Sequence, residues 1–395
     1  MNASIDQRRL LTGGLLASML VLMVSQGSND IVTWFAFGRA IEDHGLGELY
    51  RTNRLFNHPP LMGYYSWLTM RLSDASGLPF AWLFKLPSLV ANGVTAVVLA
   101  RIWQARGMPE LGVRAQLLFI WSPCAVLIAA FHGNTDCLVV MACMLSVHEL
   151  QVSKRPLAAG LWLAAALNVK VIPILAVLPL LATVRSARGR LGFVAGVGLG
   201  LIPFAVAGIA FGPSVVSNIF GYGSNLEAWG FTGLAAPLRA LPLGVGTAVS
   251  AGLDVYRSSF GRICVIGSSL VLTLYALRRP IAPAAALALS MSAFLIFAPG
   301  FGVQYVIYAA APWLAITLGP ARWFDLAAGG FIAWTYAHFT VDWFPWRSWH
   351  TGPIPEPITY LGLVAWGLLV YLAVREIRPS RVVEQERLTG DGTTS

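Results

Sequence analysis

The stretch SNDIVTWFAFGRAIEDHGLGELYRTNRLFNHPPLMGYY, residues 28–65, directly follows an apolar run that is long enough to cross a bilayer. Only 11% of the chain is charged, yet this stretch gathers Asp30, Arg39, Glu42, Asp43, Glu48, Arg51 and Arg54. A change from apolar to densely charged sequence marks the point where a chain leaves the membrane. The stretch therefore predicts a polar segment that the preceding helix anchors at the membrane surface.

The composition predicts an integral membrane protein, because 56% of the 395 residues are hydrophobic and the mean hydropathy is +0.67. Only helices satisfy their own backbone groups within one apolar segment, so the fold class is an all-α polytopic membrane protein with about 10–12 transmembrane helices. The predicted spans are 10–28, 82–103, 113–130, 136–152, a pair of half-length helices across 156–184, 191–210, 262–277, 281–298, 303–319, 325–341 and 357–374.

The basic residues predict the orientation of these spans. With Arg8 and Arg9 in the cytoplasm, the inner ends collect 17 Lys and Arg residues and the outer loops hold 9. This is the positive-inside pattern, so the net charge of +9 reflects topology and indicates no nucleic-acid partner. Both termini are then cytoplasmic. The Ala, Gly and Arg richness favours a bacterial inner membrane, with residues 1–378 as one membrane domain and 379–395 as a disordered cytoplasmic tail.

Two long outer segments hold most of the polar residues outside the membrane, which is where chemistry is expected. They are residues 29–81 and 212–261. Within the first, PPLMGYYSWLTMRLS (59–73) predicts an amphipathic helix that begins at proline and lies along the interface. A short re-entrant helix is the alternative for the same residues.

Three groups of polar residues adjoin the apolar runs. Asp30 stands where the first helix leaves the bilayer, where partial desolvation is expected to raise the pKa of its carboxyl towards that of a general base; a solvated helix end is the alternative. His132, Asn134 and Asp136 share the turn AAFHGNTDCLVV (129–140), either as ordinary turn and cap residues or as a polar site at the same face. Gln304 and Tyr305 suit sugar hydroxyls or an interfacial aromatic belt.

Lys170, in AALNVKVIPILAVLPLL (165–181), is interpreted as the one cation inside an apolar run. Both ends of that run are basic, so it is expected to enter and leave on the cytoplasmic side as two half-helices that break near Pro173. A buried ammonium requires an anion, and a phosphate group would supply one.

Several motifs of other protein classes are missing from the sequence. There is no phosphate-binding Gly-x-x-x-x-Gly-Lys-Ser/Thr loop, no His-Glu-x-x-His, no Gly-x-Ser-x-Gly and no cysteine pair at zinc spacing. The sequence gives no support to a nucleotide-driven pump, a zinc protease or an α/β-hydrolase.

In order and placement these segments resemble the C-type (GT-C) superfamily of polytopic membrane glycosyltransferases. The resemblance rests on Asp30 after the first span, NHPPLMGYY (57–65), FKLPSLVANGVTAVVLARI (84–102), HGNTD (132–136), LNVKVIPILAVLPLL (167–181) and GFGVQYVIY (300–308). It implies a GT-C fold with a large first outer loop that carries interfacial helices, and a bacterial mannosyltransferase-like branch.

The resemblance also implies an activity and roles for these residues. The protein would move a hexose, most closely mannose-like, from a polyprenyl-phosphate donor to a lipid or glycan acceptor at the outer membrane face, with inversion. Asp30 would be the catalytic base, and Lys170 or Arg54 would stabilise the leaving phosphate. His58, His132, Asn134, Asp136, Gln304 and Tyr305 complete the expected donor site. Asp30 stands alone rather than in an acidic pair, so a divalent cation, Mg²⁺ or Mn²⁺, is left open.

Two other classes remain open from the sequence. A lipid or sugar transporter or flippase would show two related halves with broken helices in matching positions, whereas one candidate break is found. An assembly subunit without catalytic activity is the third class.

Overall fold

The structure of the protein, a computed structural model, describes residues 5–221, 228–239, 244–339 and 355–378. Within these ranges every regular element is helical and no strand is present. The predicted tail, residues 379–395, lies outside the described residues. The prediction of an all-α chain is thus confirmed for the described part.

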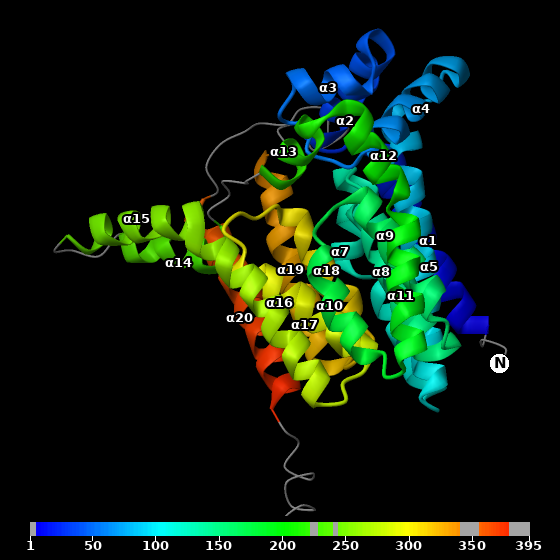
Figure 1. Ribbon diagram of the computed structural model, residues 1–395, viewed down its shortest axis with the longest axis vertical. Helices are drawn as coiled ribbons and strands as arrows, with labels where there is room; N and C mark the ends of the chain where they lie inside the picture. Colours follow the sequence, from blue (N-terminus) through cyan, green and yellow to red (C-terminus); the bar gives the residue numbers. More distant parts are fainter. Residues whose placement is uncertain (1–4, 222–227, 240–243, 340–354, 379–395) are drawn as a thin grey trace, which may run out of the picture.

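Three helices of the first outer segment form one end of the molecule, as the upper part of Figure 1 shows. They are α2 (Asn29–His44), α3 (Leu46–Thr52) and α4 (Pro60–Ser76). Two later helices pack against them, α12 (Ile202–Phe211) and α13 (Pro213–Gly221). The segment 29–81, which was predicted to lie outside the membrane, is therefore largely helical, and α4 begins at Pro60, as the proline-led pattern predicts.

The remaining helices form the bundle below that end and two helices that project sideways, α14 and α15 (Figure 1). The first half of the bundle contains α1 (Ile5–Val24), α5 (Phe80–Ala105), α6 (Pro109–Ile120), α7 (Pro123–Val126), η1 (Leu127–His132), α8 (Asp136–His148), η2 (Glu149–Ser153), α9 (Pro156–Val169), α10 (Ile174–Thr183) and α11 (Ala187–Gly200). The second half contains α14 (Gly230–Arg239), α15 (Val245–Val255), η3 (Tyr256–Phe260), α16 (Gly261–Arg278), α17 (Pro283–Phe297), η4 (Val303–Val306), α18 (Ile307–Leu314), α19 (Gly319–Phe339) and α20 (Glu356–Ile377).

Fewer helices are long and apolar enough to span a membrane than the sequence predicts. Among the described residues six qualify, or seven if a pair bent by 46°, Pro109–Ile120 with Pro123–His132, is one span. The predicted span 113–130 is this bent pair, because Pro123 interrupts the helix. The predicted span 303–319 is a 3₁₀ turn followed by an eight-residue helix. The chain is a multi-spanning protein in which several apolar segments are short or bent.

The boundary of the second outer segment also differs from the prediction. Residues 246–278 form a single helical stretch of 33 residues, so helix begins well before the predicted start of the span at residue 262. The half-helix prediction at 156–184 matches the structure more closely. There α9 ends at Val169, residues 170–173 are not helical, and α10 begins at Ile174.

The charged residues that follow the first helix mostly pair with one another at the surface. Arg39 binds Asp74 at 2.9 Å and Arg71 binds Glu42 at 2.8 Å, and both pairs join α2 to α4. Beneath these pairs Trp34 packs against Phe84 in the core. Tyr65 of α4 contacts the same Phe84 ring, which belongs to α5. Because exposed ion pairs contribute about 0–1 kcal/mol each, these buried aromatic contacts with α5 are the main attachment of α2 and α4.

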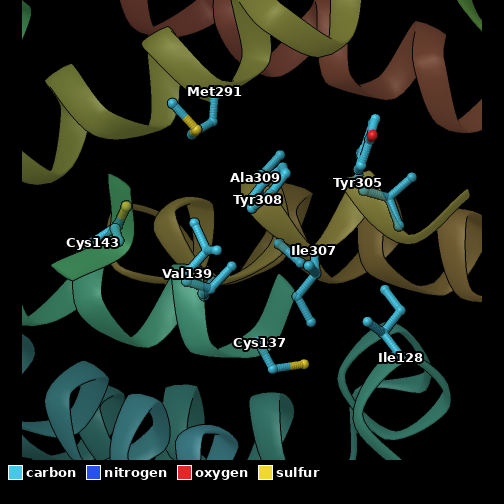
Figure 2. Packing of buried hydrophobic residues seen from close by; sticks show 14 of the residues in the cluster. Ile128, Cys137, Val139, Cys143, Met291, Tyr305, Ile307, Tyr308 and Ala309 are labelled. Carbon is cyan, nitrogen blue, oxygen red and sulfur yellow. The ribbon is translucent and has the colours of Figure 1, made fainter. Parts of the chain in front are cut away.

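The core of the bundle is built from small and sulfur-containing residues as well as aromatic ones. Figure 2 shows Cys143 of α8, Met291 of α17 and Tyr308 of α18 in one buried layer. Nearby, α9 and α11 cross at glycines. A Cβ atom on Gly160 would overlap the carbonyl oxygen of Phe193, and one on Gly196 would overlap that of Leu157. Close approach of the two backbones therefore requires glycine at this crossing.

We predict that Gly196→Val lowers the thermal midpoint of the detergent-purified protein. The added atoms overlap backbone that cannot move aside, and overpacking of this kind costs about 1–3 kcal/mol. Gly198→Val is the matched control, because Gly198 lies on the same helix and a Cβ atom added to it would meet no other atom within 4 Å. Equal midpoints for the two variants would contradict the glycine requirement.

Candidate functional site

The candidate site forms where the start of α2 meets the turn between η1 and α8. Ser28 donates hydrogen bonds from its backbone nitrogen and its hydroxyl to the carbonyl oxygen of His132, at 3.1 and 3.0 Å. The same hydroxyl accepts the backbone N–H of Asp30 and caps α2. Gly133 has a φ of +78°, which favours glycine, and a Cβ atom there would overlap Ile31. These contacts bring Asp30 to the turn.

Asp30 receives two partners from that turn. Its Oδ2 accepts a 2.6 Å hydrogen bond from Asn134 Nδ2 and lies 3.2 Å from His132 Nε2. The aspartate side chain is 31% exposed, whereas that of His132 is 5% exposed. The carboxylate is thus held from the protein side and still reaches the solvent.

The acidity of Asp30 is opposite to the sequence expectation. Burial acts to raise its pKa, but the charge and hydrogen bond of His132, the charge of Lys170 and the hydrogen bond of Asn134 outweigh it and lower the pKa to about 2. The expected upward shift is therefore wrong, because it considered desolvation without these partners. Asp30 is ionised at neutral pH.

Lys170 lies on the far side of Asn134 from Asp30. Its Nζ is 2.9 Å from each carboxylate oxygen of Asp136 and 3.4 Å from Asn134 Oδ1. Asp136 is fully buried and also accepts a hydrogen bond from the hydroxyl of Tyr308. The anion that compensates the buried ammonium is thus Asp136, whereas the sequence suggested a phosphate. Asn134 joins the two carboxylates into one network.

Three other residues that were predicted for the donor site are Tyr305, Gln304 and His58, and of these Tyr305 contacts Lys170 directly. Tyr305 is buried, and its ring centroid is 5.0 Å from Lys170 Nζ. Gln304, beside it in η4, is half-buried. The His58 ring contacts that of Trp34 in a tilted arrangement, with 4.5 Å between the ring centroids. Burial, followed by the charge of Lys170, lowers the pKa of its imidazole to about 3. His58 is therefore neutral at neutral pH and adds no positive charge to a phosphate site.

Lys170 and Tyr305 also line a cavity of about 340 Å³. Its walls are mostly apolar, with Ile172, Phe220 and Ile266 among them, and it contains two arginines, Arg257 and Arg262. Both arginines come from the long helix that runs through η3 into α16. Arg54 does not line this cavity and is exposed on the turn after α3. The cavity thus has a mostly apolar wall and three cationic side chains, those of Lys170, Arg257 and Arg262.

Sequence reasoning missed several residues of this region. Arg257 and Arg262 are not among the predicted site residues, although their position just before an apolar run was the available signal. Lys85 is a second buried cation inside an apolar helix, which corrects the view that Lys170 is the only one. Its Nζ donates to the carbonyl oxygens of Leu22 and Ser25 at the end of α1. Lys85 therefore fixes the segment that leads into Ser28.

The described residues contain no group of three or more His, Cys, Asp or Glu side chains arranged to hold a metal ion. Asp30 and His132 are two such side chains in contact. The carboxylate oxygens of Asp136 already accept hydrogen bonds from Lys170 and Tyr308. The residues do not form a built site for Mg²⁺ or Mn²⁺, so no chemical step is assigned to a metal.

Comparison with known proteins identifies no relative: no protein-family model matches the chain, and no curated protein sequence matches it significantly.

We predict that Lys170→Met and Asp136→Leu each destabilise the protein strongly, because either change leaves a buried charge without its partner. Breaking one side of such a pair costs about 3–5 kcal/mol. The double variant should lose much less than the sum of the two single losses. Additive losses in thermal midpoint, measured in one detergent, would show that the pair is not coupled.

Proposed function

We propose that the protein is an inverting glycosyltransferase that moves a hexose from a polyprenyl-phosphate donor to a hydroxyl of a lipid or glycan acceptor. The observation that carries the proposal is the Asn134 side chain, which links the partly exposed Asp30 to Lys170, a cation lining an apolar cavity that also contains Arg257 and Arg262. A polyprenyl phosphate has matching chemistry, namely a long apolar chain next to an anion.

In the proposed reaction the acceptor oxygen attacks the anomeric carbon from the face opposite the lipid phosphate. The carbon–oxygen bond to the phosphate breaks, and its electron pair stays on the phosphate oxygen. The acceptor proton passes to the Asp30 carboxylate, which is ionised at neutral pH. Arg257, Arg262 and the Lys170 ammonium stabilise the charge that grows on the leaving phosphate.

The neighbouring polar groups have positioning roles in this proposal. His132 and Asn134 hold the carboxylate in place, since both touch its Oδ2. His58, Gln304 and Tyr305 are candidates for contacts with sugar hydroxyls. A site at the membrane surface agrees with such a substrate, because the prenyl chain stays in the bilayer while the sugar reaches polar residues. The mannose-like donor, the outer face and the GT-C family remain part of the proposal.

A transporter or flippase is the second candidate, and one observation favours it. Lys170, Asp136 and Tyr308 form a buried ionic network, and such networks also occur on ion pathways of carriers. The two functions give different results with purified protein and polyprenyl-phosphate mannose. Release of lipid phosphate in the presence of an acceptor lipid supports transfer, whereas movement of intact donor across a vesicle membrane without release supports transport.

We predict that Asp30→Asn lowers the rate of lipid-phosphate release by about 10²–10⁴-fold, because the amide cannot accept the proton. Asp43→Asn is the matched control, since Asp43 is an exposed aspartate on the same helix. Thermal midpoints of both variants show whether the fold is kept. An Asp30→Asn enzyme that is folded and as fast as wild type would exclude Asp30 as the base.

We also predict that Arg257→Gln and Arg262→Gln each raise the KM for the donor, by roughly 10–100-fold, as expected when a hydrogen bond to a charged group is lost. Arg54→Gln tests the competing assignment from the sequence, because Arg54 lies outside the cavity. A raised KM for Arg54→Gln alone would move the phosphate site to the turn after α3.

A further inference from the structure

A second cavity, of about 720 Å³, lies in a different part of the bundle. One wall comes from α6 and α7, and the other from the end of α18 and the start of α19. The walls are mainly leucines, together with Trp121 and Pro123. Trp121 and Leu326 are 48% and 50% exposed, so the cavity opens as a groove on the outside of the bundle. None of the residues proposed for glycosyl transfer lines it.

Two arginines also line this groove. Arg114 lies in the second turn of α6, and Arg322 lies in the first turn of α19. Both are exposed, and neither belongs to an ion pair among the described residues. Two acids lie near these arginines. Glu110 is exposed and does not line the groove, whereas the buried Asp325 does line it, and its Oδ1 accepts a 2.6 Å hydrogen bond from Ser122. The groove therefore carries two guanidinium groups that form no ion pair with Asp325 or any other carboxylate in the described part of the chain.

The position of the arginines along the groove points to the chemistry of the occupant. Both helices begin at the end of the bundle where the short arginine-rich connections lie, and Arg106 binds the carbonyl oxygen of Ala315 there. Arg114 and Arg322 thus lie at the end of the groove that is near the beginnings of α6 and α19, while Trp121 and Leu326 lie further along the chain from those beginnings. An apolar groove with cations at one end matches acyl chains with an anionic headgroup. A soluble anion would leave the apolar wall uncovered.

We infer that this groove binds an anionic phospholipid of the leaflet at the arginine-rich end, with the phosphate between Arg114 and Arg322 and an acyl chain along Leu118, Trp121 and Leu326. Guanidinium groups suit this role because they form paired hydrogen bonds to phosphate oxygens. The inference is independent of the proposed glycosyl transfer.

The test is native mass spectrometry of the full chain, released from detergent in the presence of dioleoyl phosphatidylglycerol or dioleoyl phosphatidylcholine. We expect tighter binding of phosphatidylglycerol to the wild type. Arg114→Gln with Arg322→Gln should weaken that binding by roughly 30-fold, since each basic residue near a lipid headgroup contributes about a fivefold factor. Arg188→Gln with Arg278→Gln removes the same charge from exposed arginines outside the groove and should leave binding unchanged.

Two further variants keep the inference testable if the double glutamine variant fails to fold. Arg114→Lys with Arg322→Lys keeps the charge but loses the paired hydrogen bonds, so it should weaken binding less than the double glutamine variant does. Leu118→Trp fills the apolar part of the groove and should also weaken binding. Equal loss in the groove and control variants, equal binding of the two lipids, or displacement of the lipid by inorganic phosphate alone would overturn the inference.

Discussion

The candidate site depends on the pairing of one buried ammonium with one buried carboxylate. Lys170 lies where α9 ends, and Asp136 lies where α8 begins. Their contact therefore joins two helix ends that are far apart in sequence. Neither charge is tolerable alone in this environment. Because Lys170 also contacts Asn134, and Asn134 contacts Asp30, the position of the exposed carboxylate follows from the position of the buried pair.

The backbone around the site reinforces this arrangement from the opposite side. Lys85 binds the last carbonyl oxygens of α1, and Ser25 and Ser28 then bind the carbonyl oxygens of Ala130 and His132. The end of the first helix is thus tied to the same turn that carries Asn134. Asp30 is held through its own backbone as well as through its side chain, which suits a group that must meet a substrate without reorganising.

The sequence predicted several of the residues that lie together around Asp30, but it did not predict the partners that they take, and it also named Arg54, which lies elsewhere. Asp30, His132, Asn134 and Asp136 could be placed together because each lies at a helix end that was expected near one membrane face, and Lys170 was grouped with them only through the family resemblance. The contact between Lys170 and Asp136 depends on which way two helix ends turn, and 34 residues separate them, so no local pattern encodes it. The same holds for Arg257 and Arg262, which reach the cavity only because a helix begins earlier than the hydropathy indicates. Among the described residues fewer helices have the length and hydropathy of a span than the sequence predicts, because a short apolar helix and a full span give similar hydropathy.

In the proposed glycosyl transfer, the low pKa of Asp30 would limit how this carboxylate serves as the base. A carboxylate whose pKa is about 2 binds a proton weakly, so it cannot deprotonate a free alcohol before the reaction begins. The proton can move only after the bond from the acceptor oxygen to the anomeric carbon has begun to form, because the oxygen then becomes strongly acidic. In the proposed reaction such a late transfer requires that the phosphate is already leaving, so the proposal gives the cations of the cavity the same importance for the rate as the carboxylate. The contacts with His132 and Asn134 thus make Asp30 a weaker base, but they keep its carboxylate ionised at neutral pH and hold it in one position.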